Sequence, residues 1–114
     1  MEVRKMAKGK SPAFQFYPAD FLSDGKVCCM TLEEIGAYMI LLCHCWLEDG
    51  LPNEEKKLQK FLKISKKKFQ KIQKNVLDCF QLDEEKGRLF NPRLLKEKQQ
   101  QIENSKKRKL AAEK

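Results

Sequence analysis

The sequence has little of what most enzymes and membrane proteins depend on. It holds a single histidine, five cysteines without a C-x-x-C pair, and no glycine-rich phosphate loop. No apolar run approaches the roughly 18–20 residues that a bilayer-spanning helix needs. The basic residues 1–5 lead into no apolar segment of the kind that a signal peptide has. These absences predict a cytoplasmic, non-enzymatic protein that has no membrane partner, no metal and no cofactor, and that keeps its thiols reduced.

The histidine and the cysteines offer two alternatives, zinc binding and nucleophilic catalysis. On a helix, Cys43 and Cys45 would point about 200° apart, so they cannot both reach one ion. His44 could act as a base for Cys28 or Cys29, but no third group that would orient it is evident. Free thiols and a packed histidine are therefore the favoured interpretation.

Lysine is abundant and unevenly placed. Residues 1–49 hold 5 Lys/Arg and 7 Asp/Glu, whereas residues 50–114 hold 19 and 9. The net charge of +8 indicates an acidic partner, which composition alone leaves open among DNA, RNA, an anionic membrane and an acidic protein.

The 114 residues suffice for one small domain with a single core. We expect a flexible basic arm over residues 1–11, the domain over residues 12–95, and a basic polar tail over residues 96–114 that is helical or disordered. Only four large aliphatic side chains interrupt the polar sequence after residue 92, namely Leu94, Leu95, Ile102 and Leu110.

Aromatic residues are dense at the start of the domain. Phe14, Phe16, Tyr17 and Phe21 lie within eight residues, which favours burial in a core, with stacking on unpaired bases as the alternative. Residues 14–16 could form a short strand, and Pro18 could open a helical turn.

A central helix is predicted to begin after Thr31, whose side chain forms a capping box with Glu34. One apolar stripe follows at helical spacing, and the other faces are apolar too, which is typical of a helix buried on all sides. The helix should end at residues 49–50. The stripe consists of Leu32, Ile35, Met39, Leu42 and Trp46.

Two shorter helices and a hairpin are predicted next. Asn53 can cap the first helix, which buries Leu58, Phe61 and Leu62. Ser65 can cap the second helix, which buries residues 69, 72 and 76. Residues 80–82 and 88–90 alternate apolar with polar around a turn-like segment and predict a β-hairpin.

This order of elements predicts an α+β, mainly α fold, in particular a winged helix: a helix-turn-helix followed by a small β-hairpin wing. In such a fold the second of the short helices recognises DNA. Cations at a helix N-terminus cost about 0.3–1 kcal/mol each, so three consecutive lysines there indicate a nearby anion, with nucleic-acid phosphate as the leading candidate and a solvated surface as the alternative. The predicted nucleic-acid-binding residues are Lys66, Lys67, Lys68, Gln70, Lys71, Gln73, Lys74, Arg88 and Arg93.

Within this set, Lys67, Lys71 and Lys74 share one helix face and would contact phosphate. Gln70 and Gln73 are the only side chains on this helix suited to bidentate base contacts, so we expect affinity more than sequence specificity.

Four motifs resemble a known family. They are FYPxDFL within residues 14–22, MTLEEIGAY at residues 30–38, the segment 41–46, and GLP at residues 50–52. Together they are similar to the YdaU-like phage and prophage domain family over residues 12–98. The resemblance implies a winged-helix fold, no catalytic residues, and a role in phage replication, where such genes lie beside helicase loaders.

We therefore expect a DNA-binding, replisome-organiser-like protein that binds duplex DNA during phage or prophage replication initiation. The alternative is a protein-interaction module, either a replication adaptor whose acidic partner is a replisome protein such as a helicase loader, or a host-directed factor. The sequence shows no clear exposed apolar seam that would mark a dimer interface, so the oligomeric state stays open.

Overall fold

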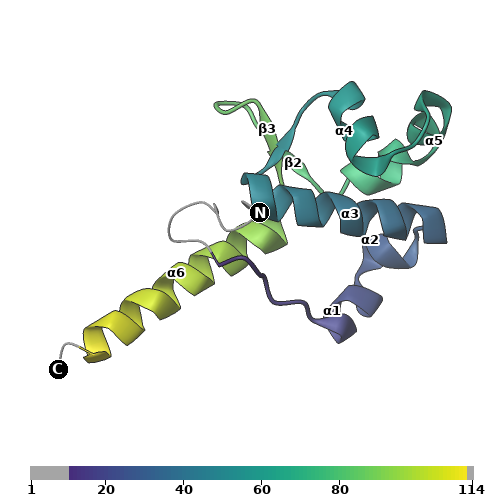
Figure 1. Ribbon diagram of the computed structural model, residues 1–114. Coiled ribbons are helices and arrows are strands. Elements are labelled where there is room, and N and C mark those ends of the chain that lie inside the picture. The colour runs from purple at the N-terminus through teal and green to yellow at the C-terminus, as the bar shows by residue number, and fades with distance from the viewer. Residues whose placement is uncertain (1–10, 113–114) are drawn as a thin grey trace.

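The longest apolar segment forms the central helix α3 (Leu32–Glu48) of the computed structural model, which describes residues 11–112 (Figure 1). The predicted capping box is confirmed: Thr31 Oγ1 accepts the Glu34 N–H at 3.2 Å, and Glu34 Oε1 accepts the Thr31 N–H at 2.7 Å. Asp49 ends the helix in the left-handed conformation. Gly50 follows at φ +118°, where an added Cβ would lie 3.0 Å from the Leu89 carbonyl oxygen.

The remaining helices and strands surround α3, and the fold is mainly helical with a small three-stranded antiparallel sheet. This confirms the predicted α+β, mainly α class. Helices α4 and α5 cover one side of α3, and α1 and α2 lie on another (Figure 1). The elements are α1 (Pro18–Ser23), α2 (Gly25–Cys28), β1 (Leu51–Pro52), α4 (Glu55–Leu62), α5 (Lys66–Leu77), β2 (Gln81–Asp83), β3 (Arg88–Phe90) and α6 (Pro92–Ala112).

The sheet contains one strand that the sequence did not suggest. Strands β2 and β3 form the predicted hairpin, with Leu82 opposite Leu89. The two-residue β1 adds to the other edge of β3, with Leu51 opposite Leu89, so the order is β1-β3-β2. A strand this short, with a proline as one of its two residues, has no alternating pattern to detect.

The core lies between α3, the α4–α5 pair and the sheet. Its fully buried side chains are Leu41, Leu51, Leu58, Phe69 and Val76. The inward face predicted for α5 is confirmed, and Ser65 caps that helix as predicted, its Oγ accepting the Lys68 N–H at 3.2 Å.

Two predictions about helix faces and caps are wrong. Leu32 was placed on the buried stripe of α3, yet 85% of it is exposed, and Ile40 and Leu47 are also exposed. Because α3 is apolar nearly all round, its periodicity could not indicate which side the other helices would cover. Asn53 does not cap α4, which begins after Glu54 without a side-chain cap.

Residues 11–17 run in an extended conformation across α3 and α6, and the expected strand at residues 14–16 is absent from this described segment. Its polar groups bond to side chains instead: the Gln15 N–H donates to Glu97 Oε2 at 3.2 Å, and Gln101 Nε2 donates to the Ala13 carbonyl at 3.1 Å. The helical turn predicted at Pro18 is confirmed as α1. Residues 1–10 of the expected basic arm lie outside the described residues.

Helix α6 begins in the domain and continues without a break past residue 96, where the tail was predicted to start. Its C-terminal half projects away from the rest of the molecule (Figure 1). Of the helices in the described part of the chain, none is both long and apolar enough to span a membrane.

Candidate nucleic-acid interface

Helices α4 and α5 are joined by only three residues. Lys63 ends α4 in the left-handed conformation (φ 57°), and the Lys63 and Ile64 N–H groups bond back to the Lys60 and Gln59 carbonyls at 3.3 and 3.4 Å. Ser65 then caps α5. The turn therefore satisfies the backbone groups at both helix ends, which fixes the direction of α5 relative to α4.

The exposed side of α5 is basic because its apolar residues all face the core. Phe69, Ile72 and Val76 are buried. Opposite them, the side chains that the sequence placed on one face are all exposed: Lys67, Gln70, Lys71 and Lys74, together with Lys66 and Lys68 in the first turn. Gln73 is half-buried at the edge of this face, so it is less available for base contacts than predicted.

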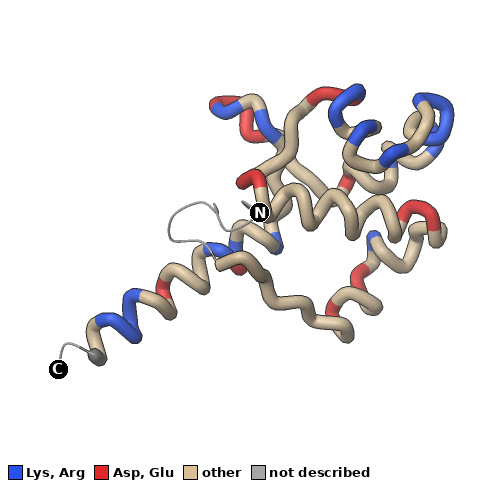
Figure 2. Tube along the Cα trace, in the orientation of Figure 1, with Lys and Arg blue, Asp and Glu red and all other residues tan. Residues whose placement is uncertain are grey.

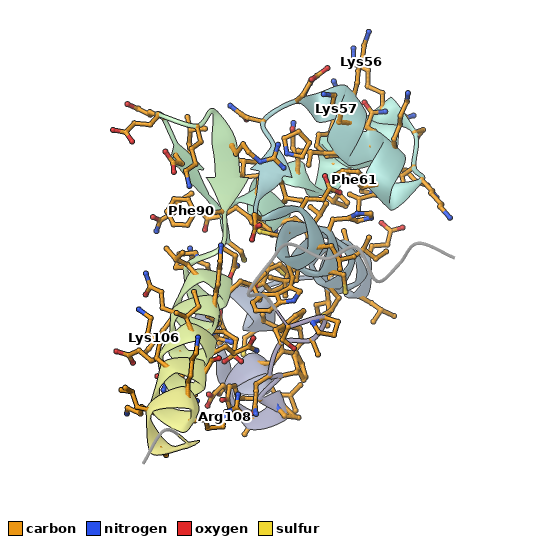
Figure 3. All side chains as sticks on the ribbon, turned by 60° about the vertical axis from the view of Figure 1, so that its left-hand side comes forward. Lys56, Lys57, Phe61, Phe90, Lys106 and Arg108 are labelled. Atoms are coloured by element: carbon orange, nitrogen blue, oxygen red, sulfur yellow. The ribbon has the colours of Figure 1, made fainter. Side chains whose placement is uncertain are left out.

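Helix α4 adds lysines that the sequence analysis did not include. Lys56, Lys57, Lys60 and Lys63 are exposed, and Figure 2 shows them next to the lysines of α5 on the outside of the helix pair. In Figure 3, Lys56 and Lys57 point away from the body of the protein. The spacing of Lys56, Lys60 and Lys63 indicates that they share one side of the helix, but only the packing of α4 beside α5 brings that side next to the lysines of α5. We call the nine residues Lys56, Lys57, Lys60, Lys63, Lys66, Lys67, Lys68, Lys71 and Lys74 the lysine surface.

Almost no acidic group neutralises the lysine surface. Lys57 Nζ lies 3.4 Å from Glu54 Oε2, and in the described part of the chain the other eight lysines have no ion pair. The one acidic residue at the C-terminal end of α5, Asp78, is paired with Lys26 at 3.6 Å. Positive charge is therefore concentrated at the N-terminus of α5, where the helix dipole is also positive.

Arg88 already has partners in the body of the protein. It is half-buried, and its Nη2 donates to the Gly50 carbonyl at 2.8 Å and lies 4.0 Å from Glu48 Oε1. Those contacts join β3 to the end of α3. Next to it, the β2–β3 turn carries Glu84 and Glu85, and Asp83 Oδ1 accepts the Glu85 and Lys86 N–H groups. The turn is therefore partly acidic, which disfavours phosphate.

Arg93 also lies away from the lysine surface. Its Nη2 is 3.0 Å from Asp24 Oδ2, the carboxylate that caps α2. The basic cluster of residues 106–109 is on the projecting end of α6, far from α4 and α5 in Figures 2 and 3. The structure brings the predicted lysines together but places both arginines elsewhere.

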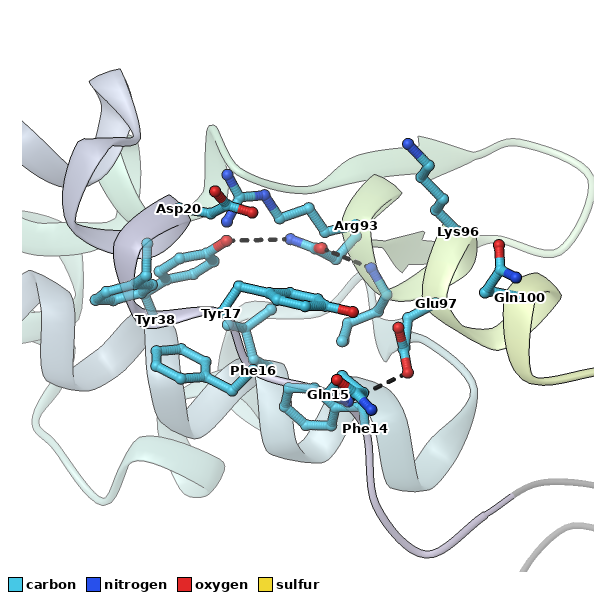
Figure 4. Close-up of a pocket in the computed structure, with 14 residues that line it drawn as sticks. Phe14, Gln15, Phe16, Tyr17, Asp20, Tyr38, Arg93, Lys96, Glu97 and Gln100 are labelled. Carbon is cyan, nitrogen blue, oxygen red and sulfur yellow. Dashed lines mark hydrogen bonds between the residues drawn. The ribbon is translucent and has the colours of Figure 1, made fainter. Parts of the chain in front are cut away.

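The aromatic residues at the start of the domain are partly core. Phe14 packs on Trp46 (centroids 5.4 Å apart) and Phe21 stacks on Tyr38 (6.1 Å). Phe16 and Tyr17 stay exposed on the rim of a cavity of about 380 Å³ between residues 14–21 and α6 (Figure 4). Burial raises the pKa of Tyr38 beneath it.

Charges of both signs line this cavity. Asp20 and Glu97 contribute negative charge and Arg93 and Lys96 positive charge, and Glu97 already accepts bonds from Gln15 and from Gln101 Nε2. The cavity therefore has no excess charge that would select an anionic ligand.

The single histidine packs on an aromatic ring and lies beside a carboxylate. His44 stacks on Phe61 with ring centroids 4.0 Å apart, and its Nδ1 lies 3.4 Å from Glu48 Oε2. Across residues 11–112, no three His, Cys, Asp or Glu side chains are arranged to hold a metal ion.

Comparison with known proteins gives one match. A family model described as a protein of unknown function (DUF1376) matches residues 12–98, which run from the start of the extended segment into α6. No curated protein and no solved structure matches the chain significantly.

Proposed function

We propose that this chain, which belongs to the DUF1376 family, is a non-enzymatic DNA-binding protein that contacts duplex DNA through the lysine surface. The observation that carries the proposal is the cluster of eight lysines that have no ion pair among the described residues. DNA phosphates supply a dense array of negative charge, and lysines that replace condensed counterions gain affinity from the release of those counterions.

The arrangement of elements supports a winged-helix interpretation of the fold. The order α3-β1-α4-α5-β2-β3, the strand order β1-β3-β2 and the three-residue turn between α4 and α5 are what a helix-turn-helix with a hairpin wing requires. In that arrangement α5 is the recognition helix and lies in the major groove, and the lysines of α4 lie over the phosphate backbone.

The chemistry of the surface favours affinity over sequence specificity. Lysine binds phosphate as a point charge and lacks the planar fork with which arginine reads guanine. Gln70 is the one exposed glutamine on α5 that lies among the lysines, because Gln73 is half-buried. We therefore expect binding to many duplex sequences with similar affinity.

The resemblance to a phage and prophage domain family supports a role in replication initiation, in which a basic domain would hold DNA next to the replication machinery. A replisome protein with an acidic surface, such as a helicase loader, is the second candidate partner. The lysine surface suits this partner as well as DNA, whereas the acidic side chains of Asp83, Glu84 and Glu85 at the β2–β3 hairpin would repel phosphate and an acidic protein alike.

The proposal is tested by charge reversal on α5. The combination of Lys67→Glu, Lys71→Glu and Lys74→Glu should weaken binding to random duplex DNA at least about 100-fold, since it removes three cations and adds three anions. These side chains are exposed, so folding should be unaffected. Fluorescence anisotropy at low salt measures the affinity, and circular dichroism checks the fold.

A matched control keeps the net charge equal. Lys106→Glu, Lys107→Glu and Lys109→Glu change the charge by the same amount on the projecting end of α6. This control should lose far less affinity than the α5 variant. Equal losses in the two variants, or unchanged binding in a folded α5 variant, would contradict the proposal.

A further inference from the structure

The side of α3 that faces away from the core is apolar from end to end. Six residues at helical spacing form it, and none of them is charged; Met39 is half-buried and also packs against the core. The exposed fractions are 85% for Leu32, 43% for Ile40 and 50% for Leu47. We call Leu32, Gly36, Met39, Ile40, Cys43 and Leu47 the α3 stripe.

Helix α3 is the longest helix of the body, and a surface helix normally places polar residues on its solvent side. Figure 2 shows no charged residue along α3 between its first turn and its last. A contiguous apolar patch of this kind on a highly charged protein marks a surface that another molecule covers. The part of the chain that the structure describes leaves Leu32, Ile40 and Leu47 exposed.

We propose that a second copy of the chain covers the α3 stripe, with the two α3 helices packed antiparallel about a twofold axis. The stripe is symmetric in size about the midpoint between residues 39 and 40. An antiparallel pair centred there places Leu32 opposite Leu47, Gly36 opposite Cys43, and Met39 opposite Ile40. Leucines meet at the two ends, Met39 meets Ile40 at the centre, and the small residues Gly36 and Cys43 meet in between, so that each residue type faces its complement as a self-complementary interface requires.

The surface next to the stripe has a matching shape. A groove of about 230 Å³ runs beside the N-terminal half of α3. It is lined mostly by apolar residues, among them Leu32, Gly36, Ile40, Leu62 and Ile64, and its two charged lining residues are Glu33 and Lys68. A Cβ added at Gly36 would meet no atom within 4 Å, so the groove is open at that point. In the antiparallel pair, Leu47 of the partner subunit lies over this groove, and each copy provides one groove and one leucine.

The twofold axis has a consequence for the lysine surface, and this step rests on the proposed function. The axis lies in the contact plane and is perpendicular to both α3 helices. Rotation about it reverses the direction of α3, but the α4–α5 pairs of the two copies stay on the same side of the two α3 helices, measured along the axis. Both lysine surfaces of the dimer then face one side and can contact one duplex. Their mutual repulsion weakens the dimer at low salt, and bound DNA or added salt relieves it.

Sedimentation velocity of the full chain tests the dimer in the absence of DNA. A contact centred on one helix face is at the small end of stable interfaces, so we expect a monomer–dimer equilibrium in the micromolar range. Ile40→Glu and Leu47→Glu should each shift the dissociation constant upward at least about tenfold, since each places a charge in the apolar contact. Leu82→Glu is the matched control, because Leu82 is 46% exposed on β2 and should leave the equilibrium unchanged.

Cross-linking tests the register. The variant first carries Cys28→Ser and Cys29→Ser, which remove the exposed thiols other than Cys43. In that background, Gly36→Cys should form a disulfide with Cys43 of the partner subunit under mild oxidation. The same protein with Cys43→Ala should not cross-link. A chain that stays monomeric up to about 200 µM, with or without duplex DNA, overturns the proposal. So does a dimer that Ile40→Glu and Leu47→Glu leave intact.

Discussion

Helices α3 and α5 pack against each other through apolar faces, yet their outer faces have opposite chemistry. The outer face of α5 carries five lysines, whereas the α3 stripe carries no charged side chain. On α5 the sequence marks the outer face clearly, because charge and apolar residues alternate with the helical period. On α3 the same period is hidden, since apolar residues occur on every side.

The difference between the two helices separates two kinds of partner. The contact proposed for the α5 face exchanges counterions for DNA phosphates and should therefore depend on salt. The contact proposed for the α3 stripe rests on the removal of water from apolar side chains, so salt should not weaken it. Changes to the core, to the junction between the helices and to the cations around them should therefore have distinct and separable effects.

The largest expected effect contrasts the two sides of α3. Leu41 is 0% exposed, and Leu41→Ala should lower the free energy of unfolding by about 2–5 kcal/mol. Leu32 is 85% exposed, and Leu32→Ala should change it by less than about 0.5 kcal/mol. Urea unfolding at low protein concentration measures both. Equal losses would mean that α3 is covered on both sides within one chain.

The next effect concerns the junction of α3 with α5. The buried Glu34 carboxylate accepts the Thr31 N–H at 2.7 Å and Asn75 Nδ2 at 2.9 Å. The Thr31 backbone bond lowers the pKa of Glu34, against the opposing effect of burial. A lowered pKa in the folded state stabilises the protein at neutral pH, and this stability is lost as the pH falls through that pKa.

Glu34→Gln should therefore reduce the free energy of unfolding at pH 7 by about 1 kcal/mol. The variant should also lose less stability than the wild type between neutral pH and about pH 3. Urea unfolding at several pH values measures this difference. Parallel pH profiles for the two proteins would show that Glu34 does not couple the helices through its charge.

A smaller effect is expected at the turn between α4 and α5. Lys63 has φ 57°, a conformation that glycine adopts at lower cost. Lys63→Gly should raise the free energy of unfolding by about 0.5–1 kcal/mol. It should also reduce the salt slope of duplex binding by about 0.9, the value for one phosphate contact.

Lys63→Asn is the control for that turn, because asparagine tolerates the same backbone conformation without a charge. Lys63→Asn should reduce the salt slope as much as Lys63→Gly does, and it should raise the free energy of unfolding by less. An unchanged salt slope in both variants would remove Lys63 from the lysine surface.

The smallest effect separates Arg93 from the lysines. Arg93 is paired with Asp24 at 3.0 Å on the α2 side of the molecule, so Arg93→Ala should change duplex affinity by less than about twofold. Lys71→Ala on the exposed face of α5 should weaken it several-fold. Anisotropy titrations of the two variants at one salt concentration compare them. A larger loss for Arg93→Ala would place the DNA on the other side of the protein.

Local signals predicted the parts of this fold that depend on neighbouring residues. Thr31 and Ser65 cap their helices as expected, and the buried face of α5 is correct, because each depends on a pattern within one helix. The partners of Arg88 and Arg93 come from other elements, so the sequence could not indicate that they are occupied.

The candidate site was predicted only in part, because some of its residues are brought together by tertiary packing. The lysines of α5 followed from spacing alone, whereas the addition of Lys56 and Lys60 depends on how closely α4 and α5 pack. The exposed side of α3 depends on where three other elements lie against it. The positions of those elements are a tertiary property, and the sequence of a helix that is apolar on all sides, such as α3, does not indicate them.

The most direct test of the central claim is fluorescence anisotropy of the wild-type chain with random duplex DNA and matching single strands, at about 50 and 200 mM salt. With about six phosphate contacts, we predict micromolar or tighter duplex binding at the lower salt and a loss of affinity near 10³-fold at the higher. Absence of duplex binding at low salt, despite a net charge of +8, would contradict the account and favour an acidic protein as the partner of the lysine surface.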